Sequence, residues 1–311
     1  MTFSLRRKKI FVAGHNGMVG QAICKRLSKE NCEILTVNKS SCDLRNQRDV
    51  SQWMQENKPN GVIICAAKVG GILANDSFPV DFLEDNLLIQ TNIIKSAFEI
   101  KVEKLIFLGS SCIYPKETPQ PIKESYLLTS SLEETNEWYA IAKITGLKLC
   151  EAYRKQFGCD FISAMPTNLY GPGDNYDLET SHVIPALIKK MHVAKLAKKK
   201  EVIIWGTGKP LREFMFVDDC ADGIIFLMKE YSDNSHINLG YGSEISILDL
   251  AMKIKEIVGF SGILVFDEKK PDGIERKLLN SKKMNDLGWK PRVNLDDGLQ
   301  KTYEDFVMNN E

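Results

Sequence analysis

Short apolar runs alternate with longer amphipathic segments through the first half of the chain. Five runs have the length and apolar character of buried strands: residues 9–13, 33–37, 61–66, 104–109 and 160–165. Between them, apolar residues recur at helical spacing, most extensively over residues 80–100 and 136–157. Strands and helices that alternate in this way predict an α/β fold, a doubly wound parallel sheet of the Rossmann type.

Turn residues become frequent after the fifth strand, and the run over residues 166–175 predicts an exit from the sheet. We therefore expect residues 1–166 to form one domain, with a return segment near 213–236. Residues 167–311 are expected to form mainly a second, smaller α/β domain. One helix of that part should begin after Ser246, whose hydroxyl is a good N-cap.

The charge balance and the cysteine pattern limit the classes of function. Lys and Arg together number 41, and so do Asp and Glu, so no excess of positive charge points to nucleic acid or to an anionic membrane. No run of about 18 apolar residues and no signal-peptide core is present, which predicts a soluble chain that is not secreted. The eight cysteines lack CxxC spacing, so we expect no metal site and a reducing, cytoplasmic environment.

A glycine-rich turn joins the first strand to the first helix, with the sequence Gly14-His15-Asn16-Gly17-Met18-Val19-Gly20. Such a turn lets the backbone approach a pyrophosphate at a helix N-terminus, so it predicts a dinucleotide site, although glycine-rich turns are frequent without one. The second strand ends without the Asp or Glu that binds the ribose of NAD. Lys39 stands there instead and suits a 2′-phosphate, which favours NADP(H) unless this lysine is only solvated.

Tyr139 and Lys143 are one turn apart on the same face of the predicted helix over 136–157. A nearby cation favours the phenolate form of a tyrosine, so the pair is suited to move a proton to or from a substrate oxygen. Ser110 follows the fourth strand and is expected at the same sheet edge, where it would bind the carbonyl that Tyr139 protonates during hydride addition. Taken alone, the pair would be a chance feature of a helix and Ser110 part of a turn.

Cationic and aromatic side chains of the second part are candidates for contact with a substrate. Arg212 carries the planar guanidinium that binds phosphate oxygens in pairs. Lys190 belongs to a helix with a basic face, which either meets substrate phosphates or is simply solvated. Trp205 either stacks on a base or fills the core, and the sequence leaves both possibilities open.

These motifs resemble the extended short-chain dehydrogenase/reductase family, whose members act on nucleotide sugars. The longer blocks 67–71, 109–115, 165–172 and 181–185 narrow the resemblance, over nearly the whole chain, to the GDP-L-fucose synthases of that family. Those enzymes convert GDP-4-keto-6-deoxy-D-mannose to GDP-L-fucose by 3,5-epimerisation and then NADPH-dependent reduction at C4. The resemblance implies the same reaction here, with a GDP-sugar substrate, NADP(H) as cofactor and a homodimer formed through the two long helices.

The resemblance also implies roles for residues at matching positions. Cys112 and His182 would form the acid/base pair of the epimerisations. Without the resemblance, Cys112 would be interpreted as a buried small apolar residue and His182 as a surface residue at the start of a helix. Ser110, Tyr139 and Lys143 would serve the reduction. The implied cofactor contacts are Gly14, His15, Asn16, Gly17, Met18, Val19, Gly20, Lys39, Leu108, Gly109, Ser110, Lys143, Pro166, Thr167, Asn168, Leu169 and His182. The implied substrate contacts are Lys190, Trp205, Arg212 and Asp272.

Two departures leave the cofactor preference open: Asn16 stands where some relatives carry a basic residue, and Lys39 where others carry Arg. The nearest rivals are a 4-epimerase and a 4,6-dehydratase of the same fold. A dehydratase would carry an Asp-Glu pair where this chain has Ser111 and Cys112, and a 4-epimerase favours an acidic residue after the second strand. A non-catalytic NADP-binding regulatory protein would typically lack the tyrosine or the lysine that this chain retains.

Overall fold

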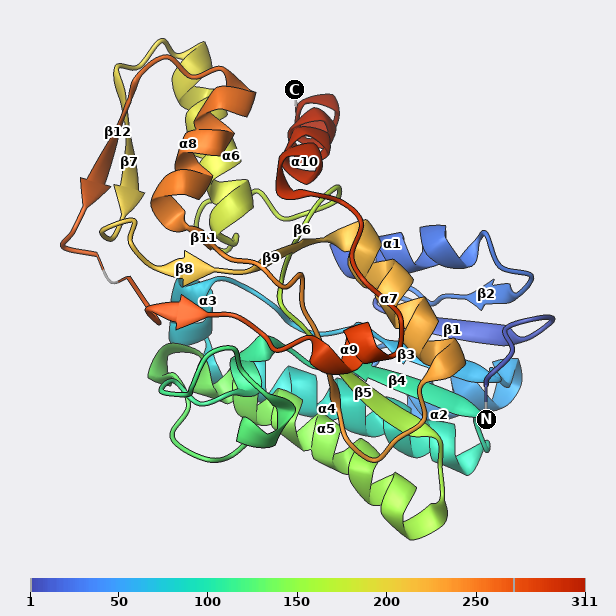
Figure 1. Ribbon diagram of the computed structural model, residues 1–311. Coiled ribbons are helices and arrows are strands. Elements are labelled where there is room, and N and C mark those ends of the chain that lie inside the picture. Colours follow the sequence, from blue (N-terminus) through green and yellow to red (C-terminus); the bar gives the residue numbers. More distant parts are fainter. Residues whose placement is uncertain (1, 271, 311) are drawn as a thin grey trace.

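A parallel sheet of six strands lies at the centre of the larger part of the molecule, in the order β10-β5-β4-β3-β1-β2. The computed structural model describes residues 2–270 and 272–310 (Figure 1). The six strands are β1 Lys9–Ala13, β2 Glu33–Leu35, β3 Gly61–Ile64, β4 Lys104–Leu108, β5 Phe161–Pro166 and β10 Ile237–Leu239. The predicted doubly wound α/β fold is thereby confirmed. Its strand order reverses between β1 and β3, and such switch points are where open α/β sheets bind ligands.

Helices cover both faces of this sheet, with α1 and α7 on one face and α2, α4 and α5 on the other (Figure 1). Their bounds are α1 Met18–Leu27, α2 Gln47–Asn57, α4 Pro79–Glu99, α5 Glu137–Phe157 and α7 Val217–Glu230. Successive strand residues face opposite sides, so Ile10 joins the core under α1 and Phe11 the core under α4. This two-sided burial explains why the strands are continuous apolar runs.

Two segments from the second half of the sequence return to this sheet. Helix α7 packs against α1, and β10 pairs in parallel with β5, with Ile237 opposite Ala164. The short strands β6 (Asn168–Tyr170) and β9 (Phe214–Phe216) pair beside them and connect the sheet to the rest of the chain.

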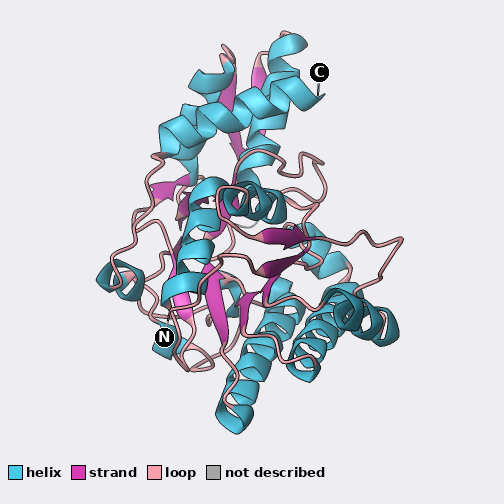
Figure 2. Ribbon diagram, turned by 90° about the vertical axis from the view of Figure 1, so that its right-hand side faces the viewer, coloured by secondary structure: helices cyan, strands magenta, loops and turns pink. Residues whose placement is uncertain are grey.

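The remaining elements form a smaller unit with its own apolar core. Figure 2 shows its helices and small strands at the end of the molecule that carries the C-terminus. Its elements are α6 Val183–Leu196, β7 Glu201–Trp205, β8 Leu211–Arg212, β11 Ile245–Ser246, α8 Ile247–Val258, β12 Ile263–Asp267, β13 Arg276–Lys277 and α10 Leu295–Asn310. Ser246 caps α8 as predicted, because its Oγ accepts a hydrogen bond of 3.0 Å from Asp249 N.

Two further short helices, α3 (Ile72–Ser77) and α9 (Lys282–Asp286), lie outside these layers. No periodic pattern of apolar residues predicts α3, which is only six residues long. Within the described part of the chain, no helix combines the length and the apolar character that crossing a bilayer requires.

Candidate active site

A cavity of about 1480 Å³ runs along the carboxyl ends of β1, β3, β4 and β5 and continues between the sheet and the smaller unit. Both units contribute to its wall, with Gly109 and Pro166 following sheet strands and Arg212 coming from β8. Every candidate catalytic, cofactor-binding or substrate-binding residue from the sequence analysis, from Gly14 to Asp272, lines this cavity. The fold therefore brings together candidates that lie more than 200 residues apart in the chain.

The glycine turn forms one end of the cavity. Gly14 has φ +92°, and a Cβ there would lie 2.6 Å from the Ala66 backbone. A Cβ on Gly20 would lie 2.1 Å from Gly14 O, so the first turn of α1 closes directly on the loop. Helix α1 begins after Gly17 without a side-chain cap or an acidic residue in its first turn. Its free N–H groups are thus available to an anion such as a pyrophosphate.

The end of β2 forms the adjoining wall. Asn16 Nδ2 donates to Asn38 Oδ1 at 3.2 Å, which ties the glycine turn to the segment that carries the exposed Lys39. Asp43 also lines the cavity, but Arg45 binds this carboxylate at 2.6 Å, and that hydrogen bond lowers the pKa of Asp43 to about 2. Asp43, the first acidic residue after β2, is therefore already paired with Arg45.

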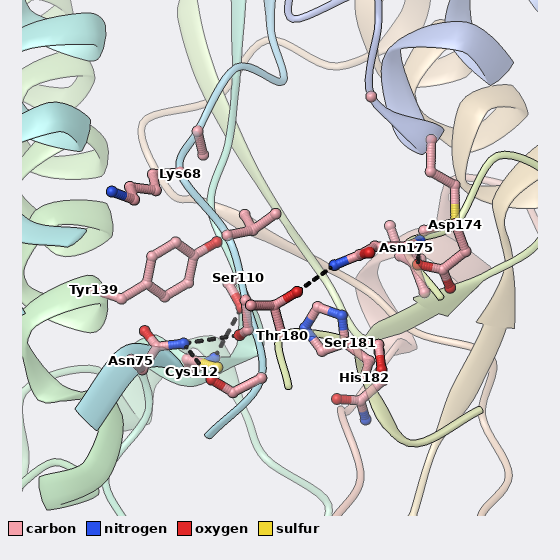
Figure 3. Close-up of a pocket in the computed structure, with 18 of the residues that line it drawn as sticks. Lys68, Asn75, Ser110, Cys112, Tyr139, Asp174, Asn175, Thr180, Ser181 and His182 are labelled. Atoms are coloured by element: carbon pink, nitrogen blue, oxygen red, sulfur yellow. Dashed lines mark hydrogen bonds between the residues drawn. The ribbon is translucent and has the colours of Figure 1, made fainter. Parts of the chain in front are cut away.

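Tyr139, Lys143 and Ser110 meet where β4 and α5 reach the cavity. In Figure 3 the Tyr139 hydroxyl points into the cavity beside Ser110. Burial raises the pKa of Tyr139 above its ordinary value, with the Cys112 thiol adding to the rise and a hydrogen bond with Ser110 opposing it. The phenol therefore keeps its proton at neutral pH, which suits a donor to a carbonyl oxygen.

Lys143 is almost fully buried beneath this tyrosine. Its Nζ donates to Leu108 O at 2.9 Å and lies 5.7 Å from the centre of the Tyr139 ring. Burial lowers the pKa of Lys143 to about 8. The expected cation beside Tyr139 is present, but burial is the largest influence on the pKa of the phenol and raises it.

Cys112 and His182 lie on different sides of the cavity (Figure 3). Cys112 belongs to a single 3-10 turn, residues Ser111–Ile113, whose start is fixed by a bond of 3.2 Å from Cys112 N to Ser110 Oγ. His182 immediately precedes α6 and is exposed to the cavity, while the protein around it lowers its pKa through desolvation. A thiol and an imidazole thus face one space from two units of the fold.

The smaller unit supplies the other end of the cavity. Trp205 is half-exposed, and Lys190 and Lys270 place their ammonium groups 5.4 and 5.0 Å from its ring. The Arg212 guanidinium donates to two backbone carbonyls, those of Leu211 and Asp272, at 2.9 and 3.4 Å. Burial lowers the pKa of Arg212, which Asp272 partly opposes. This end presents cations beside an exposed aromatic ring.

The Asp272 carboxylate has a local role in the structure. It accepts hydrogen bonds from Thr207 N at 2.7 Å and from Thr207 Oγ1 at 2.8 Å, which fixes the turn after β7. Asp272 therefore lines the cavity with its carboxylate already bound to protein.

A family model matches residues 10–240, which include the glycine turn, Ser110 and the Tyr139–Lys143 pair. The chain belongs to the NAD dependent epimerase/dehydratase family. A GDP-L-fucose synthase of Sinorhizobium fredii is 54% identical over 307 residues, which cover 99% of this chain and 98% of that protein.

Two solved structures of similar proteins agree with this assignment. A GDP-6-OMe-4-keto-L-xylo-heptose reductase from C. jejuni has a TM-score of 0.94 at 35% identity, and each chain is covered completely. A GDP-L-fucose synthetase from Naegleria fowleri, solved with NADP bound, has a TM-score of 0.91 at 29% identity and covers 99% of this chain and 97% of its own.

The cavity of this epimerase/dehydratase family member is lined by residues with buried polar atoms that have no hydrogen-bond partner among the described residues. Asn75 Oδ1, Asp174 Oδ2 and Ser181 Oγ are buried without a hydrogen bond among the described residues, and all three residues line the cavity. Together with the glycine turn and Lys39, they form a wall that fits a polar dinucleotide such as NADP. The described residues contain no group of three or more His, Cys, Asp or Glu that could hold a metal ion.

For four residues of the cavity, no role could be inferred from the sequence. Lys277 contacts Cys112 from a strand of the smaller unit, and Asn75 lies on the unpredicted α3. Asp174 belongs to the turn-rich exit from the sheet, where polar residues are ordinary, and Ser181 stands in the block 181–185 without a role assigned to it. No local spacing marks any of them, although Lys277 and Asn75 are both buried polar residues.

Proposed function

We propose that this chain converts GDP-4-keto-6-deoxy-D-mannose to GDP-L-fucose in one site, by epimerisation at C3 and C5 followed by reduction at C4 with NADPH. The observation that carries the proposal is the shared cavity. All five candidate residues line it: Ser110, Tyr139 and Lys143, which we assign to the reduction, and Cys112 and His182, which we assign to proton transfer. The relationship to a GDP-L-fucose synthase at 54% identity over almost the full length supports the same activity.

The epimerisations follow from the acidity of hydrogens next to a ketone. The Cys112 thiolate takes the proton from C3 or C5, and the electron pair of that C–H bond moves into an enolate. His182, on another side of the cavity, returns a proton to the opposite face of the same carbon. The negative charge of the enolate favours the protonated imidazole and so offsets the lowering of the His182 pKa by desolvation.

The reduction uses the residues at the sheet edge. NADPH, when bound, supplies the hydride that adds to C4. Ser110 binds the C4 oxygen, and Tyr139 gives that oxygen its proton as negative charge develops there. Lys143, buried against Leu108 O, holds a positive charge beneath the tyrosine and orients the nicotinamide ribose. The glycine turn and Lys39 hold the pyrophosphate and the 2′-phosphate.

The other end of the cavity suits the GDP moiety. Arg212 and Lys190 provide charge for the diphosphate, and half-exposed Trp205 offers a ring for contact with the nucleoside. In this arrangement the larger unit, with its return segment, binds the cofactor and the smaller unit binds most of the substrate.

We further propose a cytoplasmic homodimer that pairs through α4 and α5. These helices pack along each other and expose apolar side chains, with Leu88 41% and Ile141 39% accessible. Light scattering behind a size-exclusion column should give twice the mass of one 311-residue chain. A monomeric mass would refute the dimer and leave the activity untouched.

The decisive experiment supplies the enzyme with GDP-4-keto-6-deoxy-D-mannose and NADPH, follows NADPH absorbance and identifies the sugar by NMR. We expect GDP-L-fucose, with NADH giving slower turnover in a parallel reaction. NADPH oxidation that yields a sugar not inverted at C3 and C5 would make the protein a simple 4-reductase, and the roles of Cys112 and His182 would then be wrong. NADPH binding without turnover would favour a regulatory protein.

A further inference from the structure

The ammonium group of Lys277 lies 3.5 Å from the sulfur of Cys112, although the two residues are 165 positions apart in the sequence. Lys277 belongs to β13 and is buried, with 8% of its surface accessible. Among the described residues, its ammonium group donates to this sulfur and to no carboxylate. The neighbouring Arg276 differs, since Glu244 binds its guanidinium at 2.7 Å. A buried lysine beside a thiol rather than a carboxylate calls for an explanation.

Hydrogen bonds on both sides of β13 fix this arrangement. Leu278 N donates to Gln120 Oε1 at 2.9 Å, and Ile122 N donates to Leu278 O at 2.7 Å. On its other side β13 pairs with β8, which places Lys277 opposite Arg212. The segment that carries Lys277 is therefore anchored to the loop after Cys112 and to the strand that carries the phosphate-binding candidate.

We propose that Lys277 is a positioning residue for the epimerisations, which holds the Cys112 thiolate by charge and a hydrogen bond at the reacting carbon. This inference rests on the proposed function. A cation next to sulfur stabilises the thiolate, which is the form that accepts a proton. When Cys112 takes the proton from C3 or C5, the C–H bond breaks and an S–H bond forms. Lys277 keeps its own protons throughout and acts only on the charge of the sulfur.

The same position links substrate binding to the base. Because Lys277 is opposite Arg212 across a strand pair, binding of the diphosphate at Arg212 also steadies the strand that holds Lys277. The proton-accepting residue, Cys112, is thus held in place by the smaller unit, which binds the GDP. The residues assigned to the reduction, Ser110, Tyr139 and Lys143, belong to the larger unit with the sheet. Lys277 should therefore matter for proton exchange and not for hydride transfer.

The test separates these two steps. Deuterium uptake at C3 and C5 is followed by NMR in D₂O with the keto-sugar and NADP, in a Tyr139→Phe background that blocks reduction. Adding Lys277→Met should slow uptake about 10- to 100-fold, whereas Lys277→Arg, which keeps the charge, should restore much of the rate. Lys123→Met removes an exposed lysine from the loop after Cys112 and serves as the matched control.

A second measurement uses enzyme that retains Tyr139. The initial rate of NADP reduction by GDP-L-fucose, the reverse of the hydride step, should stay within about threefold in Lys277→Met. Alkylation of Cys112 by iodoacetamide, followed by peptide mass spectrometry, should slow in Lys277→Met and recover in Lys277→Arg.

Several outcomes would overturn the inference. Unchanged deuterium uptake in Lys277→Met would do so, and so would an equal loss of exchange and hydride transfer, which would indicate a structural role. If Lys277→Met does not fold, Lys277→Gln and Lys277→Arg take its place, and equal exchange rates in those two variants refute a role for the charge. Absence of uptake in Tyr139→Phe alone would contradict the proposed epimerisation itself.

Discussion

Asp174 lies in the loop that passes over α1, where the fold disfavours a charged carboxyl. Its Oδ2 is buried without a partner among the described residues, and its Oδ1 accepts one hydrogen bond, of 2.7 Å, from Asn175 N. Burial raises the pKa of Asp174 from 3.8 to about 7, and the Asn175 bond opposes this only in part. At pH 8 the Asp174 carboxylate is therefore charged at a poorly solvated position in the folded protein, whereas in the unfolded chain water solvates the same charge.

The sign and size of the effect follow from this pKa. Between about pH 4 and pH 7 the folded state retains a proton that the unfolded state has lost, so the free energy of unfolding falls as the pH rises. A difference of about 3 pKa units corresponds to at most about 4 kcal/mol at pH 8. Asp174 is only partly buried and faces a cavity that water can enter, so we expect about half of this, about 2 kcal/mol.

Asp174→Asn removes the charge and nearly preserves the shape. In urea unfolding at pH 4, 5, 6, 7 and 8, this variant should differ from the wild type by less than about 1 kcal/mol at pH 4 and be more stable by about 2 kcal/mol at pH 8. A stability difference that does not grow between pH 4 and pH 8 would refute the argument, because every other titrating group is common to both proteins.

Asp177→Asn provides a control of opposite sign three residues further on. The Asp177 carboxylate accepts hydrogen bonds from Glu179 N at 3.1 Å and from Thr180 N and Oγ1 at 3.0 and 2.9 Å. These bonds, that from the Thr180 side chain first, lower the pKa of Asp177, so it stabilises the fold above its unfolded pKa and ceases to do so as the pH falls. Its removal should reduce stability at pH 8 and change little at the acid end.

Three further substitutions test the site. Tyr139→Phe should abolish NADPH oxidation by the keto-sugar while deuterium still enters C3 or C5, and loss of both signals by NMR would contradict separate roles. Cys112→Ser should slow that exchange at least about tenfold more than the reverse hydride step, measured from GDP-L-fucose and NADP. Gly20→Ala places a Cβ 2.1 Å from Gly14 O, so calorimetry should show NADPH binding weakened at least about tenfold, and unchanged affinity would refute the close packing.

The layered sheet could be predicted because its signals are local. Strands β1, β3, β4 and β5 are largely buried apolar runs, and each long helix repeats apolar residues at its own period. The pairing of β10 could not be predicted, since its three residues at 237–239 carry no sign that their partner is β5. Helix α3 was missed for a similar reason, because six residues are too few to establish a period.

The candidate site likewise contains residues that local sequence patterns predict and residues that they do not. The glycine turn, the residues after β4 and the Tyr139–Lys143 pair are short patterns, and each is positioned by the end of a strand or by one helix face. Lys277 and Asp174 depend on contacts between segments far apart in the chain, and neither belongs to a spaced motif. Their significance lies in burial and missing partners, which only a folded chain reveals.

The protonation state of Tyr139 bears on the order of the two proposed reactions. Epimerisation requires the C4 ketone, because its reduction removes the acidity of the neighbouring hydrogens, so hydride transfer must come last. A phenol whose pKa is raised by burial keeps its proton while the ketone is present and the carbons beside it are epimerised. The same phenol yields that proton only when hydride addition creates an alkoxide, a far stronger base than an enolate. Tyr139 thus acts in the hydride step at this oxygen, while Cys112 and His182 act on the carbons beside it.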